Sequence, residues 1–193
     1  MNLLGSAVLD DERYRVPPVP LGQTGLAWLR GHVARFSDGA AHVRRRGLIE
    51  GLLAELVVEP VVGGDPTATL LRALGLPDTG IADVALVAAA YQPHLPQSPH
   101  ADAALERLVE ACGSRDEATA ARICVLVQAH GATQALVAKL RDAEPGPPVP
   151  TTRRIAPDGR LVEVDLVDAP FGRGRHACPG RTIGLELARA AIG

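Results

Sequence analysis

The chain has few cysteines and little aromatic content. Its 193 residues contain only Cys112, Cys124 and Cys178, an odd number whose spacing matches neither a disulfide framework nor a zinc site. Aromatic residues make up 3% of the chain, so its core has to be built from Leu, Val, Ala and Ile. Side chains of this size favour the packing of helix on helix. The composition therefore predicts a mainly α-helical protein from a reducing compartment.

The chain also lacks a charge excess and a long apolar run. Its net charge of -2 gives no overall attraction to nucleic acid or to an anionic membrane. The most apolar run, residues 81–91, is too short to span a bilayer and contains Asp83. With no signal-peptide pattern at the N-terminus, we expect a cytoplasmic protein with no nucleic-acid or membrane partner. Basic residues gather locally at 42–46, 151–156 and 172–176, which favours a small anionic ligand.

Proline-rich stretches divide the chain, and the apolar spacing between them is helical. These stretches interrupt regular structure because proline fixes its own φ and restricts the residue before it. Residues 151–166 alternate in polarity around the turn sequence PDG, which predicts a β-hairpin. We therefore predict one domain, 1–193, that is mainly α with a small hairpin. Its expected helices cover residues 37–57, 68–74, 81–91, 102–112, 115–143 and 181–192.

Two of the expected helices begin with short polar residues. Ser37 or Asp38 precedes the first helix, and Asp65 or Thr67 precedes the second. Such side chains accept hydrogen bonds from the free N–H groups of a first helical turn. We therefore expect one residue of each pair to be an N-cap.

The segment FGRGRHACPG, residues 171–180, places Cys178 among glycines directly before a helix-like run. Glycine permits positive φ and close backbone approach, so this loop can turn its N–H groups toward the sulfur. Such donors and the start of the next helix stabilise a thiolate. A thiolate held in this way is a metal ligand or a nucleophile. A nucleophile needs a facing base, whereas a metal with one cysteine ligand needs the further ligands that haem supplies.

The same segment resembles the haem-binding loop of the cytochrome P-450 family. That loop has the pattern F-G-x-G-x-H-x-C-x-G, and every fixed position is present in this chain: Phe171, Gly172, Gly174, His176, Cys178 and Gly180. The resemblance implies a reduced P-450-like helical fold and haem b (iron protoporphyrin IX), with Cys178 as the axial iron ligand. It also implies that Phe171 shields the sulfur, that the glycines permit the loop and that His176 binds a haem propionate. The alternative is a glycine-rich turn with an incidental thiol.

Residues 36–48 resemble the family's C helix. In that helix a His and an Arg four residues later pair with a haem propionate, and these positions hold His42 and Arg46. Residues four apart share one helix face, so both side chains can reach one carboxylate. The alternative is a solvated basic face around the RRR sequence.

Residues 147–156 resemble the family's strand that sends an arginine to the second propionate. Arg154 fits that position better than Arg153, although a slip of one residue exchanges them. The alternative is an exposed basic strand of the hairpin. Both haem carboxylates therefore have candidate partners in this chain.

Residues 123–140 resemble the family's I helix, which crosses the distal face of the haem. The family typically has an acid followed by a threonine at the oxygen-binding kink. Here Gly131 takes the place of the acid and Ala132 that of the threonine, with Thr133 in the next position. The resemblance therefore implies that the usual proton-relay groups are missing. His130 and Thr133 remain as candidate catalytic residues, and the alternative for His130 is a helix-surface position.

The resemblance covers four segments, while the family's E-x-x-R helix and the meander before the cysteine loop have no counterpart. It implies a haem-thiolate oxidoreductase, a monooxygenase or a peroxide-driven enzyme, that acts on a small organic substrate. A ferredoxin-type electron donor is the implied protein partner. One alternative is a non-catalytic or redox-neutral descendant that serves as a partner or haem-binding sensor. Another is a cysteine-nucleophile enzyme unrelated to haem.

Overall fold

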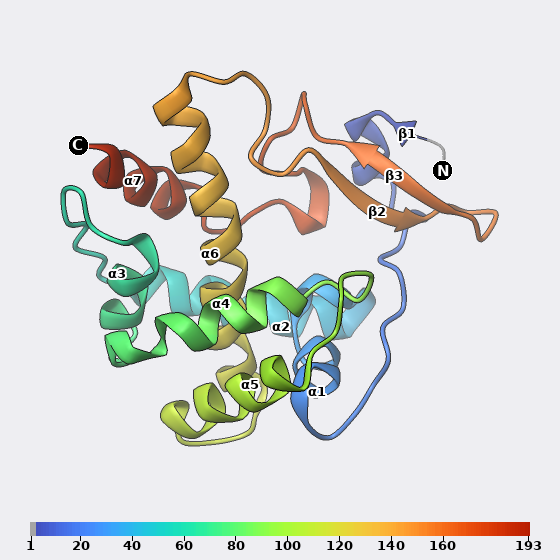
Figure 1. Ribbon diagram of the computed structural model, residues 1–193. Coiled ribbons are helices and arrows are strands. Elements are labelled where there is room, and N and C mark those ends of the chain that lie inside the picture. The colour runs from blue at the N-terminus through green and yellow to red at the C-terminus, as the bar shows by residue number, and fades with distance from the viewer. Residues whose placement is uncertain (1–2) are drawn as a thin grey trace.

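A computed structural model describes residues 3–193, and it is mainly helical, as predicted (Figure 1). A small sheet interrupts the helices late in the chain. Short 3-10 turns connect several elements, among them Ser6–Asp10, Ala34–Phe36 and Gly174–His176. The α-helices are α1 (Gly25–Gly31), α2 (Gly39–Glu55), α3 (Pro66–Ala73), α4 (Ile81–Ala90), α5 (Pro99–Cys112), α6 (Glu117–Asp142) and α7 (Arg181–Ile192).

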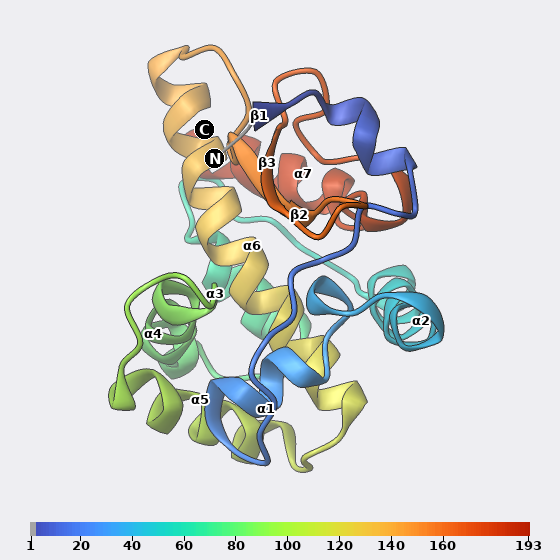
Figure 2. The same ribbon diagram turned by 90° about the vertical axis from the view of Figure 1, so that its right-hand side faces the viewer.

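Helix α6 is the centre of the molecule. Helices α2, α3, α4, α5 and α7 all pack against it, and Figures 1 and 2 show α1 and α5 near its N-terminal end. The core is aliphatic, as the composition predicts, with Trp28 and Tyr91 as buried aromatic residues. By length and composition α6 could cross a membrane, a property that the core helix of a soluble protein shares. In this fold its partners are the surrounding helices.

Of the two aspartates predicted as N-caps, Asp38 and Asp65, only Asp65 caps its helix through its side chain. Asp65 accepts hydrogen bonds from the N–H groups of Thr67 and Ala68 in the first turn of α3, which confirms that expectation. Asp38 occupies the N-cap position of α2, but its side chain makes no capping hydrogen bond to that helix. Its carboxylate instead accepts from the Val16 N–H at 2.9 Å and from Arg175 at 2.9 Å. Asp38 therefore ties α2 to two distant segments.

The predicted hairpin is present as β2 (Thr151–Ile155) and β3 (Leu161–Asp165), which pair antiparallel. Gly159 turns the chain between them with φ of 84°. A third strand, β1 (Leu3–Leu4), pairs in parallel with β3, so the sheet order is β1-β3-β2. The sequence did not predict β1 because two residues are too few to show an alternating pattern.

Three helices depart from the sequence expectation. Helix α5 begins at Pro99, ahead of the start expected at residue 102, because Ser98 caps it and proline is tolerated in a first turn. Helix α1 was not predicted, since seven residues are too short for a clear period. Helix α4 is buried on one side only, and its Leu86 is 41% exposed. An apolar run thus forms a helix with one exposed side.

Candidate functional site

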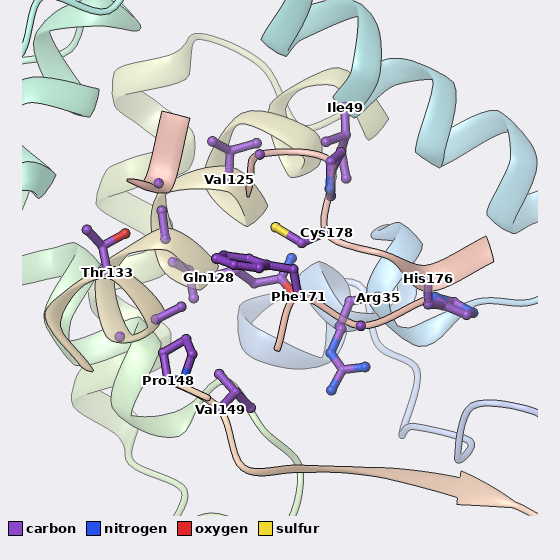
Figure 3. A pocket seen from close by; sticks show the side chains of 18 of the residues that line it. Arg35, Ile49, Val125, Gln128, Thr133, Pro148, Val149, Phe171, His176 and Cys178 are labelled. Atoms are coloured by element: carbon purple, nitrogen blue, oxygen red, sulfur yellow. The ribbon is translucent and has the colours of Figure 1, made fainter. Parts of the chain in front are cut away.

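A cavity of about 420 Å³ lies between α6, α2, β2 and the cysteine loop, which we define as residues 171–180. Figure 3 shows side chains from these elements pointing toward it, among them Cys178, Phe171 and Gln128. Its volume is in the range of small-molecule and cofactor sites. The cavity therefore brings together segments that the sequence analysis had connected only through a family resemblance.

The cysteine loop is a tight backbone structure. The Cys178 N–H donates to the Phe171 carbonyl at 2.8 Å, which closes the loop. Gly172 and Gly174 have φ of 69° and 64°, which is the left-handed region, and Gly174 also lies against the Leu9 carbonyl. Gly180 has φ of -96° at the N-cap of α7 and does not require glycine for its backbone angles. Gly172 and Gly174 therefore have backbone angles that favour glycine, whereas Gly180 does not.

The Cys178 side chain is open to the cavity, and Figure 3 shows its sulfur beside the Phe171 ring. Burial by the surrounding walls raises the pKa of this thiol, although the Gly180 N–H and the nearby Arg46 oppose the shift. The loop by itself thus favours the thiol, contrary to the expectation that its amides stabilise a thiolate. A bound metal ion would supply the missing positive charge, because metal ligation deprotonates cysteine.

Four residues that resemble propionate ligands gather at the cavity, and we call them the basic cluster: His42, Arg46, Arg154 and His176. The imidazole rings of His42 and His176 lie 4.2 Å apart, between centroids. Burial, together with the positive charge of Arg154, lowers the pKa of His176 to about 3. Burial and Arg46 also lower the pKa of His42. Both imidazoles are therefore neutral near pH 7, and each can still donate one N–H group.

Arg154 is a buried cation with no carboxylate partner among residues 3–193. Its side chain is 3% exposed and donates to the Thr152 hydroxyl at 3.1 Å and to the Arg153 carbonyl at 2.8 Å. Burial, together with the nearby charge of Arg35, lowers the pKa of Arg154 to about 10. Arg153 is not part of the cavity lining and lies 3.7 Å from Glu163 on β3. The strand therefore directs Arg154, not Arg153, to the cavity.

The basic cluster has the features of a site for a ligand with carboxylates. The Nε2 atom of His42 is buried and has no hydrogen-bond partner within residues 3–193, an arrangement that costs free energy unless a ligand completes it. Arg46 donates to Glu50 at 2.7 Å and to the Ala177 carbonyl at 2.6 Å, which joins α2 to the cysteine loop. In the described part of the chain no three His, Cys, Asp or Glu residues gather as a metal site. The donor set therefore fits haem, which brings its own nitrogen ligands and two propionates.

Helix α6 contributes one of its two predicted catalytic residues to the cavity. Thr133 lines it and is 4% exposed, next to Gly131 and Ala132. His130 is not part of the lining; its Nδ1 atom lies 2.8 Å from the Thr67 hydroxyl on α3. The structure thus places His130 at a helix contact and keeps Thr133 beside the space where a ligand would lie.

Arg35 and Gln128 are among the polar lining residues that the sequence analysis missed. Arg35 reaches the cavity from the short turn Ala34–Phe36 and donates to Thr152 at 3.3 Å. Gln128 faces the cavity from α6, and its amide donates to the Cys124 sulfur at 2.8 Å. Neither residue belongs to a recognisable pattern. For Gln128, its spacing of one helical turn from Ala132 is the signal that could have been used.

Comparison with known proteins finds similarity in structure and not in sequence. No family model and no curated protein matches the chain. P450BioI, solved in complex with an acyl carrier protein ligated to hexadec-9Z-enoic acid, matches with a TM-score of 0.67 and 15% identity, over 97% of this chain and 81% of its own. CalO2 matches with a TM-score of 0.62 and 16% identity, over 97% and 79% of the two chains.

A third solved structure is CxnD, described as a cytochrome P450 enzyme for C–S bond formation in chuangxinmycin biosynthesis. It matches with a TM-score of 0.56 and 13% identity, over 97% of this chain and 77% of its own. Identities this low carry the fold alone. The chain therefore has the fold of the cytochromes P450, as the pattern in its cysteine loop predicts.

Proposed function

We propose that this chain is a haem-thiolate oxidoreductase of the cytochrome P450 type that oxidises a small organic substrate. The observation that carries the proposal is the joint position of Cys178 and the basic cluster in one cavity beneath α6. Cys178 would bind the iron. His42 and Arg46 would hold one haem carboxylate, and Arg154 and His176 the other. When bound through a thiolate, haem supplies oxygen activation, because the thiolate favours O–O cleavage.

The residues around the sulfur support this assignment. The cysteine loop is held on both sides, by the Cys178 to Phe171 hydrogen bond and by Arg46 on the Ala177 carbonyl. The Phe171 ring lines the same cavity as the sulfur, and the Arg181 guanidinium lies 5.0 Å from the centre of that ring. A loop fixed in this way pre-orients the sulfur, which reduces the cost of binding a metal.

Peroxide-driven oxidation fits the α6 face better than dioxygen chemistry. Thr133 is the one hydroxyl that the described part of α6 presents to the cavity, while Gly131 and Ala132 supply no proton donor. Peroxide already carries the two electrons and two protons that dioxygen has to receive, so it demands less of these residues. Dioxygen would also require an electron donor, for which a ferredoxin-type partner remains our proposal.

The test is the absorbance of the haem-loaded protein after reduction and exposure to carbon monoxide. We expect the red-shifted Soret band of a thiolate-ligated haem. Cys178→Ser should abolish this band, whereas Cys112→Ser and Cys124→Ser should keep it. Failure of the wild type to take up haem, or an equal loss in all three variants, rejects the proposal.

A haem-binding protein without oxidase activity is the second candidate, and the missing donors at Gly131 and Ala132 favour it. The same preparation separates the two functions. Substrate oxidation with peroxide supports the enzyme, while full haem uptake with no oxidation by either peroxide or reductant and dioxygen supports the sensor or partner role.

A further inference from the structure

Arg35 is the cavity cation that the proposed haem leaves without a role. It is half-buried and points into the cavity from the turn Ala34–Phe36 (Figure 3). Its one side-chain hydrogen bond is to the Thr152 hydroxyl at 3.3 Å. No carboxylate lies within ion-pair distance of Arg35 among residues 3–193. A desolvated cation of this kind is costly unless a ligand compensates it.

The hydroxyl of Thr152 accepts hydrogen bonds from two cationic side chains. Arg35 and Arg154 both donate to its oxygen, at 3.3 and 3.1 Å. One neutral oxygen balances neither charge, and the two guanidinium groups repel each other across it. The surrounding ion pairs do not help, because Asp38 is engaged by Arg175 and Glu50 by Arg46. The cavity therefore has more positive charge than the chain itself neutralises.

Arg35 neighbours one residue of the basic cluster, Arg154, and also groups on other elements. The titratable groups that interact with Arg35 are Tyr91, at the end of α4, and Cys124, in α6. Those that interact with His176 are Arg154, His42 and Asp38. Arg35 thus adjoins the basic cluster at Arg154, while its neighbours Tyr91 and Cys124 lie on the side of α4 and α6.

The cavity has an apolar face. Its lining includes Ala88 on α4, Val125 and Ala129 on α6, and Val149 in the segment before β2. A ligand that fits this surface has an apolar body and an anionic end. Charge-assisted bonds to a guanidinium are the strong and directional contacts that select such an end.

We propose that Arg35 binds the carboxylate of the substrate, so that the substrate class is an organic acid whose apolar body lies along the cavity face of α6. The inference rests on the proposed function and extends it to the substrate. The four residues of the basic cluster already supply two donors for each haem carboxylate, which leaves Arg35 for a third carboxylate. Held there, the acid would present its chain, and not its head group, to Thr133 and the space above Cys178.

The test compares octanoate with octanamide, two ligands of the same shape that differ in charge. Their dissociation constants are measured by calorimetry and by the Soret shift on the haem-loaded wild type, Arg35→Met and Arg153→Met. Arg153 is the control, because it is an arginine on β2 that does not line the cavity. We expect the wild type and Arg153→Met to prefer octanoate by about 10- to 100-fold, and Arg35→Met to lose that preference.

The rate of haem loss to an acceptor protein identifies the competing role. Arg35→Met should lose haem no faster than Arg153→Met. Faster haem loss with an unchanged preference for octanoate would overturn the inference, since Arg35 would then hold a haem propionate. Equal binding of octanoate and octanamide by the wild type would overturn it as well.

Absence of haem uptake by the wild type counts against the proposed function instead. The octanoate comparison on the haem-free chain then still tests Arg35. A preference lost only in Arg35→Met supports the acid site, and a preference that survives this substitution rejects it.

Discussion

The imidazole rings of His42 and His176 lie 4.2 Å apart, although one belongs to α2 and the other to the loop before α7. Burial is the main cause of the lowered pKa values of both rings. His176 lies 3.5 Å from the Asp38 carboxylate, whereas the buried Nε2 atom of His42 has no hydrogen-bond partner within residues 3–193. The pair therefore connects the fold to the proposed haem, because an anionic ligand would complete it.

Replacing His42 should separate folding from ligand binding. In His42→Phe the unpartnered Nε2 atom is removed while the ring is kept. We expect the free energy of unfolding of the haem-free chain to rise by about 1–2 kcal/mol, and the affinity for haem to fall. Urea unfolding and haem titration measure the two effects. His100→Phe, at an exposed position of α5, is the control. A less stable His42→Phe chain would contradict this account of the cavity.

Position 174 should not tolerate a side chain, whereas position 131 should tolerate one. At Gly174 the backbone has φ of 64° and a Cβ atom would meet the Leu9 carbonyl, so Gly174→Ala has to displace the cysteine loop. We expect a loss of about 2–3 kcal/mol in unfolding free energy together with weaker haem binding. Gly131→Ala meets no atom within 4 Å and should gain about 1 kcal/mol. Thermal unfolding measures the change in stability of each variant. Similar changes in Gly174→Ala and Gly131→Ala would contradict the proposed loop geometry.

An acid at position 131 should supply the proton donor that Gly131 and Ala132 do not provide. The space at Gly131 is open and the residue lines the cavity, so Gly131→Asp places a proton donor there. We expect turnover with reductant and dioxygen to rise at least about tenfold relative to turnover with peroxide. The control is Gly51→Asp, at an open position on α2. An unchanged ratio at equal haem content would show that proton delivery at Gly131 does not limit the reaction.

Glu117 should make stability depend on pH in the acid range. Hydrogen bonds from Arg44, joined by those from Arg45, lower the pKa of Glu117 to about 2 from an ordinary value of 4.5. A depressed carboxyl pKa stabilises the fold above 4.5, and this stabilisation is lost as pH falls toward 2. We expect Glu117→Gln to be less stable by about 1 kcal/mol at pH 7, because the carboxylate is partly open to solvent.

The difference between Glu117→Gln and the wild type should shrink between pH 4.5 and 2, as measured by urea unfolding at a series of pH values. Glu110→Gln, also on an exposed helix surface, is the control. A difference that stays constant down to pH 2 would mean that the ion pairs between α2 and α6 do not contribute.

The helices and the hairpin could be predicted because their signals are local. Apolar spacing located α2 and α6 to within two residues at each end, and alternation around PDG located β2 and β3. The inward position of Arg154 could not be predicted in this way, because a slip of one residue exchanges it with Arg153. The pairing of β2 with β3 determines which of the two side chains turns inward. Register depends on the partner strand, which a single segment does not specify.

The sequence by itself determined the fold class and the position of the cysteine loop, because the loop pattern and helical periods are complete within short stretches of chain. Only the tertiary structure decided that His130 contacts Thr67, that Asp38 binds Arg175 and that Arg35 enters the cavity. Each of these contacts joins elements distant in sequence, and side-chain direction there follows from how the helices pack around α6. Packing is a property of the whole chain, and no local pattern encodes it.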